Sequence, residues 1–436
     1  MNSPKPPVRK LSLGVIFLTL YIDLVGFSII FPLLPDLLHH YLSTEGQSGL
    51  LGYLYSASVS TAHLVGNKEV YVEVLFGGVV ASLFSLLQFL LSPFWGSLSD
   101  HRGRRPVLLW TVGGTALGYL VWVFSGSFWL FVLSRIIGGI FGGNISVATA
   151  AVADVTTREE RSKAMGLVGA AFGLGLVTGP MIGALAMRFN PLAGCTAFGL
   201  NPFSFPALLS LILSVVNLVW IGRRFKEPLD EAHRQRVSAE RTRNPLRAIY
   251  DLSNPVIRKI NLIAFIHSVA FVSLEVTLTY LAADRFHYNA KQNGVLLAYL
   301  GVCSILTQGV LVRRMLKKSN ENSILRTGLL TELLGLVAIG FSSSTGMLYL
   351  GIALAAIGAG FVNPATSGLI SLHASNSEQG KAIGVFRSLG ALSRAITPIV
   401  AGLIYWGASG TSLYAAAAAV SLFALILAAR LPKPAQ

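Results

Sequence analysis

Residues 96–106, GSLSDHRGRRP, join two long apolar segments and place one acid and three arginines within a short stretch. Gly96 permits a close backbone approach and Gly103 permits a tight turn, because glycine carries no side chain. Asp100 and the three arginines can form ion pairs where two helices leave a membrane and meet water. The stretch therefore predicts two membrane-spanning helices joined by a charged turn, a feature typical of membrane transporters.

The composition agrees with a membrane protein. Of the 436 residues, 53% are hydrophobic and 12% are charged, and the mean hydropathy is +0.64; a soluble domain carries about 25% charged residues. Apolar runs of about 20 residues cross a hydrocarbon core of roughly 30 Å, and backbone groups in lipid are satisfied within a helix. We therefore predict an all-α membrane protein with twelve transmembrane helices in two pseudo-symmetric six-helix bundles. The expected helices span residues 11–35, 74–98, 106–125, 128–150, 162–187, 203–222, 259–283, 292–314, 322–342, 346–371, 380–405 and 411–430.

The positive charge is concentrated on one side of the predicted bundles. In a soluble chain the net charge of +15 would suggest a nucleic-acid partner. With a cytoplasmic N-terminus, however, the opposite side carries only Lys68, Arg188, Arg285 and Lys291. The positive-inside rule then predicts two cytoplasmic termini, in a plasma membrane, a bacterial inner membrane or an intracellular membrane. The expected partners are the lipid bilayer, a small-molecule substrate and protons, with no nucleic acid and a monomeric state.

No sequence pattern indicates an enzyme. Only Cys195 and Cys303 occur, in different halves, so that neither a disulfide framework nor a thiol metal site is predicted. The chain has no phosphate-cradling Walker sequence, which argues against an ATP-driven pump. No nucleophile–base or metal-ligand constellation stands out. We therefore expect no catalytic residue, no metal and no cofactor.

The chain divides into two halves. A polar, Arg-rich segment, residues 223–258, separates residues 1–222 from residues 259–436, and each half contains six expected helices. We therefore predict two six-helix bundles joined by a cytoplasmic basic linker.

An internal repeat supports this division. KAMG at residues 163–166 recurs as KAIG at residues 381–384, and at the same offset of 218 residues Pro180 falls on Pro398. The eleventh helix is therefore the counterpart of the fifth, as expected for two parallel repeats about an axis along the membrane normal.

Two arginines interrupt the repeat in the eleventh helix. At the same offset, Gly169 becomes Arg387 and Leu176 becomes Arg394. The arginines are two helical turns apart and share one face, and Arg394 lies about 20 Å beyond Lys381, inside the membrane. A charge there costs roughly 2.5–3.5 kcal/mol. Both arginines are therefore expected to face a polar interior with compensating partners.

Three motifs resemble signatures of the major facilitator superfamily. Residues 96–105 resemble its signature between helices 2 and 3, and Arg135 with Gly139 resembles its helix 4 signature, with Gly138 where glutamine is common. A third motif resembles the antiporter signature of twelve-helix drug:proton antiporters, with Ala184 where a second glycine is usual. This motif consists of Gly166, Gly175, Gly179, Pro180 and Gly183.

Two narrower resemblances concern substrate class. The first helix, LYIDLVGFSIIFPLLPDLL with Asp23, is similar to tetracycline exporters. SLEVTLTYLAADRF and FRSLGALSRA resemble the animal tetracycline-transporter-like proteins, a group associated with organic anions. The resemblance implies proton-coupled efflux of organic anions or amphipathic drug-like molecules by alternating access. The alternatives are a facilitator or proton symporter of a small metabolite, a lipid translocator, and a transport-inactive sensor or scaffold.

Two acids are candidates to carry protons. Asp23 lies about 18 Å into the first helix, close to mid-membrane, where an ionised carboxylate is costly. It either takes up a proton or is a structural carboxylate that binds neighbouring helices or pairs with Arg135. Glu275, in the seventh helix, is either a second proton carrier or a permanent partner of Arg394. By the family resemblance, Arg135 relays protons or tunes the proton site.

Arg387 and Arg394 are candidates for an anion site, because a guanidinium offers several donors to a carboxylate or phosphate. Alternatively they form ion pairs with Glu275 or with Glu332, which is expected to be a structural partner. His267 is either a satisfied core residue or a participant in proton coupling, since histidine titrates near neutrality. Further polar residues, expected to line a cavity or to bond between helices, are Gln88, Asn144, Asn217, Gln308 and Asn363.

The charged turn is expected to form a conformational latch. Asp154 ends the fourth helix and Arg161 begins the fifth, on the same side as Asp100 and Arg104. With Gly96, these residues would stabilise the outward-open state and separate on inward opening. An exposed pair is worth only about 0–1 kcal/mol, yet a few kcal/mol suffice to shift a two-state population. The glycines of the antiporter motif are expected to permit close helix packing.

Overall fold

The computed structural model describes residues 11–46, 49, 51–56, 72–156, 158–228, 254–288, 290–316, 319–374 and 379–432. Over these residues the chain forms α-helices with short 3-10 and π segments and no strand, which confirms the predicted all-α class. The first bundle contains α1 (Leu11–Ser28), η1 (Phe31–Leu33), α2 (Leu34–Glu45), α4 (Val72–Arg102), α5 (Arg104–Val123), α6 (Phe128–Phe141), α7 (Asn144–Val155), α8 (Arg158–Arg188) and α9 (Ser204–Arg224). The second bundle contains α12 (Pro255–Phe286), α13 (Ala290–Leu306), η5 (Thr307–Leu311), α14 (Val312–Leu316), α15 (Glu321–Gly340), α16 (Thr345–His373), α17 (Gln379–Gly407) and α18 (Gly410–Ala429).

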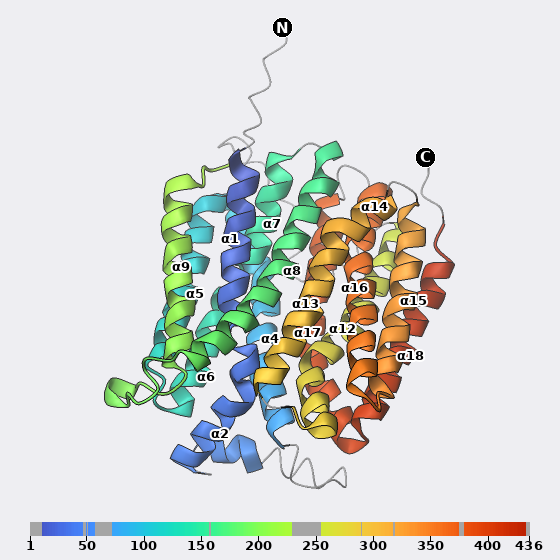
Figure 1. Ribbon diagram of the computed structural model, residues 1–436. Coiled ribbons are helices and arrows are strands. Elements are labelled where there is room, and N and C mark those ends of the chain that lie inside the picture. The colour runs from blue at the N-terminus through green and yellow to red at the C-terminus, as the bar shows by residue number, and fades with distance from the viewer. Residues whose placement is uncertain are drawn as a thin grey trace.

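The apolar helices lie where the sequence predicts them. In the described part of the chain, 10 helices are long and apolar enough to cross a membrane. Two shorter apolar stretches, Ser82–Ser92 in α4 and Gln292–Leu306 in α13, fall within the second and eighth expected helices. Both ends of the described chain lie at the top of Figure 1. We call this end of the bundles the terminal side and the opposite end the far side.

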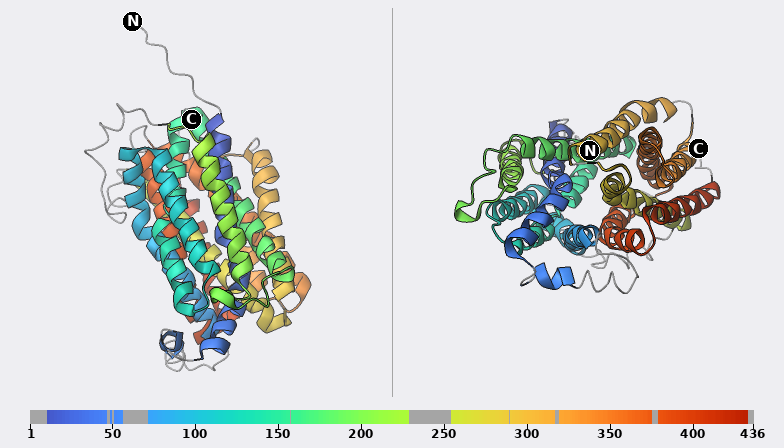
Figure 2. Two further views of the ribbon diagram at one scale, coloured as in Figure 1. Left: turned by 90° about the vertical axis from the view of Figure 1, so that its left-hand side faces the viewer. Right: turned by 60° about the horizontal axis from the view of Figure 1, so that its bottom comes forward.

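The two bundles meet through four helices. Figure 2 shows the blue-to-green helices of the first bundle beside the yellow-to-red helices of the second. α4 packs along α17, and α8 packs along α13. The offset of 218 residues relates α4 to the stretch from α13 through α14, and Pro180 inside α8 to Pro398 inside α17. Each bundle therefore supplies the same two helices to the interface, as expected for a repeat.

Each bundle has its own hydrophobic core. Four clusters of buried apolar residues occur in the described chain, and each stays within one bundle. Trp122 and Phe128 belong to the first bundle, and Tyr414 and Leu336 to the second. Close packing therefore holds each bundle together internally.

Three of the expected helices are interrupted, which the sequence analysis does not predict. The first helix ends at Ser28 and is followed by η1 and α2, because Pro32 and Pro35 lack a backbone N–H. The fourth breaks at Gly142 and Gly143 into α6 and α7. The eighth continues from α13 through the π turn η5 into α14.

Candidate functional site

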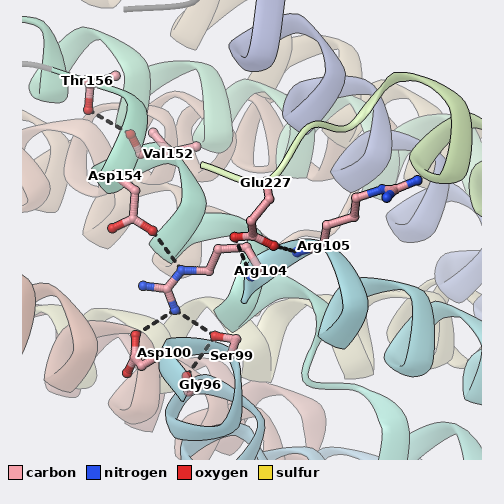
Figure 3. Close-up of polar contacts among 9 residues, drawn as sticks. All are labelled: Gly96, Ser99, Asp100, Arg104, Arg105, Val152, Asp154, Thr156 and Glu227. Carbon is pink, nitrogen blue, oxygen red and sulfur yellow. Dashed lines mark hydrogen bonds and ion pairs between the residues drawn. The ribbon is translucent and has the colours of Figure 1, made fainter. Parts of the chain in front are cut away.

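Arg104 is the centre of an ion-pair cluster on the terminal side (Figure 3). Its Nη1 lies 2.7 Å from Oδ1 of Asp100, and its Nε lies 2.7 Å from Oδ2 of Asp154. Nη1 also donates to Oγ of Ser99 at 2.6 Å. The side chains of Arg104 and Asp100 are 4% and 5% exposed, whereas that of Asp154 is 22% exposed. The structure thus brings together three of the residues that the sequence assigned to the latch.

Glu227, just beyond α9, completes this cluster. Its two carboxylate oxygens accept hydrogen bonds of 2.9 Å from the backbone N–H groups of Arg104 and Arg105 (Figure 3). A carboxylate at this position satisfies free N–H groups at the start of α5 and interacts favourably with the helix dipole. Gly103 adopts a φ of 101°, and a Cβ there would lie 2.5 Å from Oε2 of Glu227, so only glycine fits. Glu227 was not predicted from the sequence, since no motif surrounds it in the polar stretch after α9.

The other two latch residues lie in α4 and α8. A Cβ on Gly96 would lie 3.3 Å from Oγ of Ser146, so Gly96 lets α4 approach α7 closely. The side chain of Arg161 lies outside the described residues. Within the described residues, the two ion pairs of Arg104 tie α4, α5 and α7 of the first bundle to one another. Contact with the second bundle is made by α4, which packs along α17. A latch role for the cluster stays a prediction.

The glycines of the expected antiporter motif pack α8 against α1. A Cβ on Gly175 would lie 2.5 Å from the Cβ of Leu24 in α1. A Cβ on Gly183 would overlap the backbone of Ile29, just after α1. A Cβ on Gly179 would be as crowded. Pro180 is buried inside α8, whereas the surroundings of Gly166 lie outside the described residues. The described glycines therefore permit α8 to pack closely against α1, as expected from the sequence.

Gly179→Ala is expected to destabilise the protein. The added methyl would lie 2.7 Å from the carbonyl oxygen of Val25 and would overlap Oγ of Ser28, both in α1. Overpacking of this kind costs about 1–3 kcal/mol. Gly113→Ala is the matched control, because nothing lies within 4 Å of a Cβ at that position. Thermal unfolding of detergent-purified protein measures both, and equal midpoints for the two variants would contradict this reading of the helix contact.

Asp23 lies opposite the break between α6 and α7. Its carboxylate hydrogen-bonds to the side chain of Asn144, the first residue of α7. Asn144 is 3% exposed, and its Oδ1 accepts from the backbone N–H of Ile145 at 2.8 Å, which leaves the amide nitrogen to donate to Asp23. Among the described residues Asp23 forms no ion pair. The first bundle therefore holds a carboxylate that is paired with an amide and not with a cation.

Two side chains of α4 satisfy the carbonyl groups that this break leaves free. Nε2 of Gln88 donates to the carbonyl oxygen of Gly142 at 2.9 Å, and Nε1 of Trp95 donates to that of Ile140 at 2.7 Å. A Cβ on Gly143 would overlap the Trp95 ring. Gln88, one of the polar residues singled out from the sequence, thus bonds between helices and stabilises the break beside Asp23.

Arg135 of α6 is held by aromatic rings. Its guanidinium carbon lies 4.8 Å from the ring centre of Trp122 and 5.6 Å from that of Phe131, and the residue is 5% exposed. A desolvated cation–π contact is worth about 2 kcal/mol. Within the described residues Arg135 forms no ion pair with Asp23, although Tyr119 is an electrostatic neighbour of both. The structure therefore does not support the direct pairing considered above.

Glu275 of α12 and Arg394 of α17 are neighbours in the second bundle. Both are half-buried, and each acts electrostatically on the other without forming an ion pair. The structure thus brings together the second candidate proton carrier and one of the two candidate anion-binding arginines. The side chain of Arg387 lies outside the described residues.

Glu332 of α15 pairs with a histidine and not with an arginine. Its Oε2 lies 2.9 Å from Nδ1 of His267 in α12 and accepts from Oγ of Ser421 in α18 at 3.2 Å. Glu332 is 0% exposed and His267 is 1% exposed. Pairing of Arg394 with Glu332, one of the sequence-based alternatives, is therefore wrong, because α15 turns Glu332 towards α12 and α18.

The remaining polar candidates lie in three different places. Gln308 in η5 reaches the other bundle, since a Cβ on Gly173 of α8 would lie 3.4 Å from its Nε2. Asn363 of α16 is exposed. Asn217 of α9 is buried and donates to the backbone carbonyl of Thr19 at 3.0 Å. Of these three, Gln308 is the residue placed between the bundles.

Two repeated bundles of apolar helices, with polar clusters buried among the helices, define an integral multi-pass membrane protein. The family model described as Major Facilitator Superfamily matches residues 16–327 and 309–436. The chain therefore belongs to the major facilitator superfamily, which confirms the resemblance of its motifs.

The sequences of several relatives align with most of this chain. Major facilitator superfamily domain-containing protein 10 is 32% identical in mouse, over 100% of this chain and 97% of the relative, and 34% identical in human, over 99% and 95%. The class B tetracycline resistance protein of Escherichia coli is 28% identical over 88% of this chain and 86% of its own. The crystal structure of the human organic anion transporter MFSD10 (TETRAN) matches with a TM-score of 0.83 and 32% identity, over 97% of this chain and 100% of that one. The chain is thus a membrane transporter of small-molecule substrates.

Proposed function

We propose that the protein couples the efflux of organic anions or amphipathic drug-like molecules to inward proton flow by alternating access. The observation that carries this proposal is the Asp23–Asn144 pair. An ionised carboxylate deep in a membrane bundle is costly without a cation beside it, so Asp23 is suited to take up and release a proton. The likeness to tetracycline resistance proteins and to a human organic anion transporter supports the substrate class.

Charge placement supports an orientation. Lys and Arg residues are concentrated in the segments of the terminal side, so this side belongs in the cytoplasm by the positive-inside rule. Efflux then runs from the terminal side to the far side, across a plasma membrane, a bacterial inner membrane or an intracellular membrane. Residues 1–222 and 259–436 act as two moving domains of a monomer, joined by the basic linker 223–258.

Glu275 beside Arg394 favours a second candidate, symport of a proton with an anion. Ionised Glu275 competes with an anion for the guanidinium, whereas protonated Glu275 leaves the guanidinium to the anion. Proton and anion would then bind together and travel in one direction. Antiport requires instead that substrate and proton exclude each other, as they do when hydrogen-bond donors of the substrate occupy the Asp23 carboxylate.

Proteoliposomes with imposed pH gradients of both signs test these candidates. Tetracycline and a fluorescein-type anion serve as probes. Antiport predicts uptake into vesicles with an acidic lumen, and symport predicts uptake into vesicles in an acidic medium. Flux that ignores the gradient indicates a facilitator, and lipid scrambling without probe flux indicates a lipid translocator. Absence of both fluxes contradicts the transport proposal and favours a sensor or scaffold.

Arg394→Ala is expected to raise the KM for the anionic probe at least about tenfold, because a hydrogen bond to a charged group is worth about 1.5–3 kcal/mol. Arg394→Lys should restore only part of the affinity, since an ammonium lacks the planar fork of donors. The control is Arg314→Ala, an exposed arginine in α14. An unchanged KM in folded Arg394→Ala protein would remove Arg394 from the anion site, and Arg387→Ala then tests the other arginine.

A further inference from the structure

His267 and Glu332 form a buried polar pair inside the second bundle. The pair joins α12 to α15 through the 2.9 Å contact between Nδ1 and Oε2. Burial of an ionised group is costly unless a proton or a counter-charge balances it. The number of protons that the pair holds therefore decides the free-energy cost of burying it.

Ser421 of α18 has two acceptors, which match two protonation states of the pair. Its Oγ lies 3.2 Å from Oε2 of Glu332 and 3.4 Å from the carbonyl oxygen of Leu329. When Oε2 is ionised, the hydroxyl donates to it. When Oε2 carries a proton and donates that proton to Nδ1 of His267, the hydroxyl donates to Leu329. Because a serine hydroxyl rotates to suit its partners, both states are satisfied without movement of a helix.

One proton separates the two charge states of the pair. In the loaded state the pair is neutral overall, with the shared proton on Nδ1 or on Oε2 and a second hydrogen on Nε2 of His267. In the unloaded state neutral His267 donates its Nδ1 hydrogen to ionised Glu332, and Nε2 carries no hydrogen. Nε2 forms no hydrogen bond within the described residues, so it is the atom at which the proton arrives and leaves. Oε1 of Glu332 is buried without a partner there, which favours reloading.

The pair lies within electrostatic reach of Glu275. His267 precedes Glu275 by two helical turns on α12, about 12 Å, and its charge acts on that carboxyl, as does the charge of Arg394. Of the elements packed against Glu332, α18 presents the Ser421 hydroxyl, and α16 presents backbone at Gly358, where a Cβ would lie 2.5 Å from the Glu332 nitrogen. Among the described residues no other charged side chain contacts the pair.

We propose that His267 and Glu332 form a second proton-holding site, which regulates Glu275 by its charge. The inference rests on the proposed role of Glu275 in proton-coupled transport. An unloaded, negative pair favours protonated Glu275 and so leaves Arg394 to an anion. A loaded, neutral pair favours ionised Glu275 beside Arg394. The pair thereby sets the pH at which the second bundle accepts its substrate.

Two variants and one spectroscopic signal test this site. Glu332→Gln removes the negative state, so it is expected to move the midpoint of the flux–pH profile to lower pH, by up to about one unit. His267→Gln keeps the Glu332 carboxyl and serves to assign the histidine signal. Glu321→Gln, the other acid of α15, is the control and should not move it. In wild-type protein labelled with 15N-histidine, the Nε2 signal that is missing in His267→Gln should lose its hydrogen when the pair loses its proton.

The outcomes separate this proposal from the proposed function. If wild-type flux ignores pH gradients, proton coupling fails, while the Nε2 titration still reports on the pair. If flux is proton-driven but the Nε2 signal is constant and folded Glu332→Gln keeps the wild-type profile, the pair is a structural contact and the proposal is overturned. The NMR measurement on wild-type protein needs no variant beyond the assignment, so it stands even where Glu332→Gln does not fold.

Discussion

Asp23→Asn is expected to abolish uphill transport driven by a pH gradient and to leave exchange of substrate across the membrane intact. Asparagine has nearly the shape of aspartate and can still hydrogen-bond to Asn144, the partner seen in the structure. It cannot bind or release a proton. One pH unit corresponds to about 1.4 kcal/mol per proton, so coupling to one proton sustains about tenfold accumulation in the wild type. In the variant the accumulation ratio should fall to about one.

The measurement is probe accumulation in proteoliposomes with a gradient of about one pH unit, with counterflow exchange measured in the same vesicles. Asp36→Asn is the matched control, because Asp36 is an exposed acid on α2, beyond the apolar span Leu13–Leu33. It should keep both activities. Tenfold accumulation by Asp23→Asn would remove this residue from proton coupling. Loss of exchange together with accumulation would point instead to a structural role at the α6–α7 break.

Features that repeat along the chain were predictable from the sequence. The apolar runs locate the helices, since length and composition alone decide whether a segment can cross a membrane. The offset of 218 residues identifies α17 as the counterpart of α8. The structure confirms this equivalence, because α17 packs against α4 and α8 packs against α13, the counterpart of α4. The charged turn, with Asp100 and Arg104, also needs no tertiary information, because the two residues are only four positions apart in the chain, on either side of the turn at Gly103.

Features that depend on packing between distant segments were not predictable. Gly113-Gly114 stays helical inside α5, whereas Gly142-Gly143 breaks a helix. The difference comes from α4, whose Gln88 and Trp95 receive the freed carbonyl groups at the second site. A glycine pair alone does not reveal such partners. The sequence shows that a helix break would cost little free energy at either glycine pair. It does not show at which of the two pairs the break occurs.

The pairing of buried charged residues could not be predicted from the sequence either. The sequence placed Glu332 inside the membrane and offered an arginine as its partner. Its partner, His267, is 65 residues away and lies on another helix. The rotation of α15 about its own axis decides which neighbour Glu332 meets, and that rotation is set by packing against α16 and α18. Glu227 was missed for the same reason, since its partners are backbone groups of α5.

Arg104→Ala is expected to destabilise the protein by about 3–5 kcal/mol, the usual cost of removing one member of a buried ion pair. The guanidinium and the Asp100 carboxylate are both almost completely buried, so alanine removes a cation that lies 2.7 Å from this buried acid. Ser99 and Asp154 lose a charged hydrogen-bond donor as well. Thermal unfolding of detergent-purified protein measures the loss. Arg102→Ala is the control, because Arg102 is exposed over the Trp110 ring and should cost at most about 1 kcal/mol.

A double variant separates the ion pair from the rest of the cluster. If loss of the Arg104–Asp100 contact is the cause, Arg104→Ala with Asp100→Ala should be more stable than Arg104→Ala alone, because the second change removes the buried carboxylate that had faced the guanidinium. A single variant within about 1 kcal/mol of wild type, or a double variant no better than the single one, would contradict the buried-pair account. Since Arg104, Asp100 and Asp154 belong to one bundle, the loss should be the same in protein held outward-open or inward-open. A loss confined to one state would show instead that the cluster acts across the interface of α4 with α17, as a latch must.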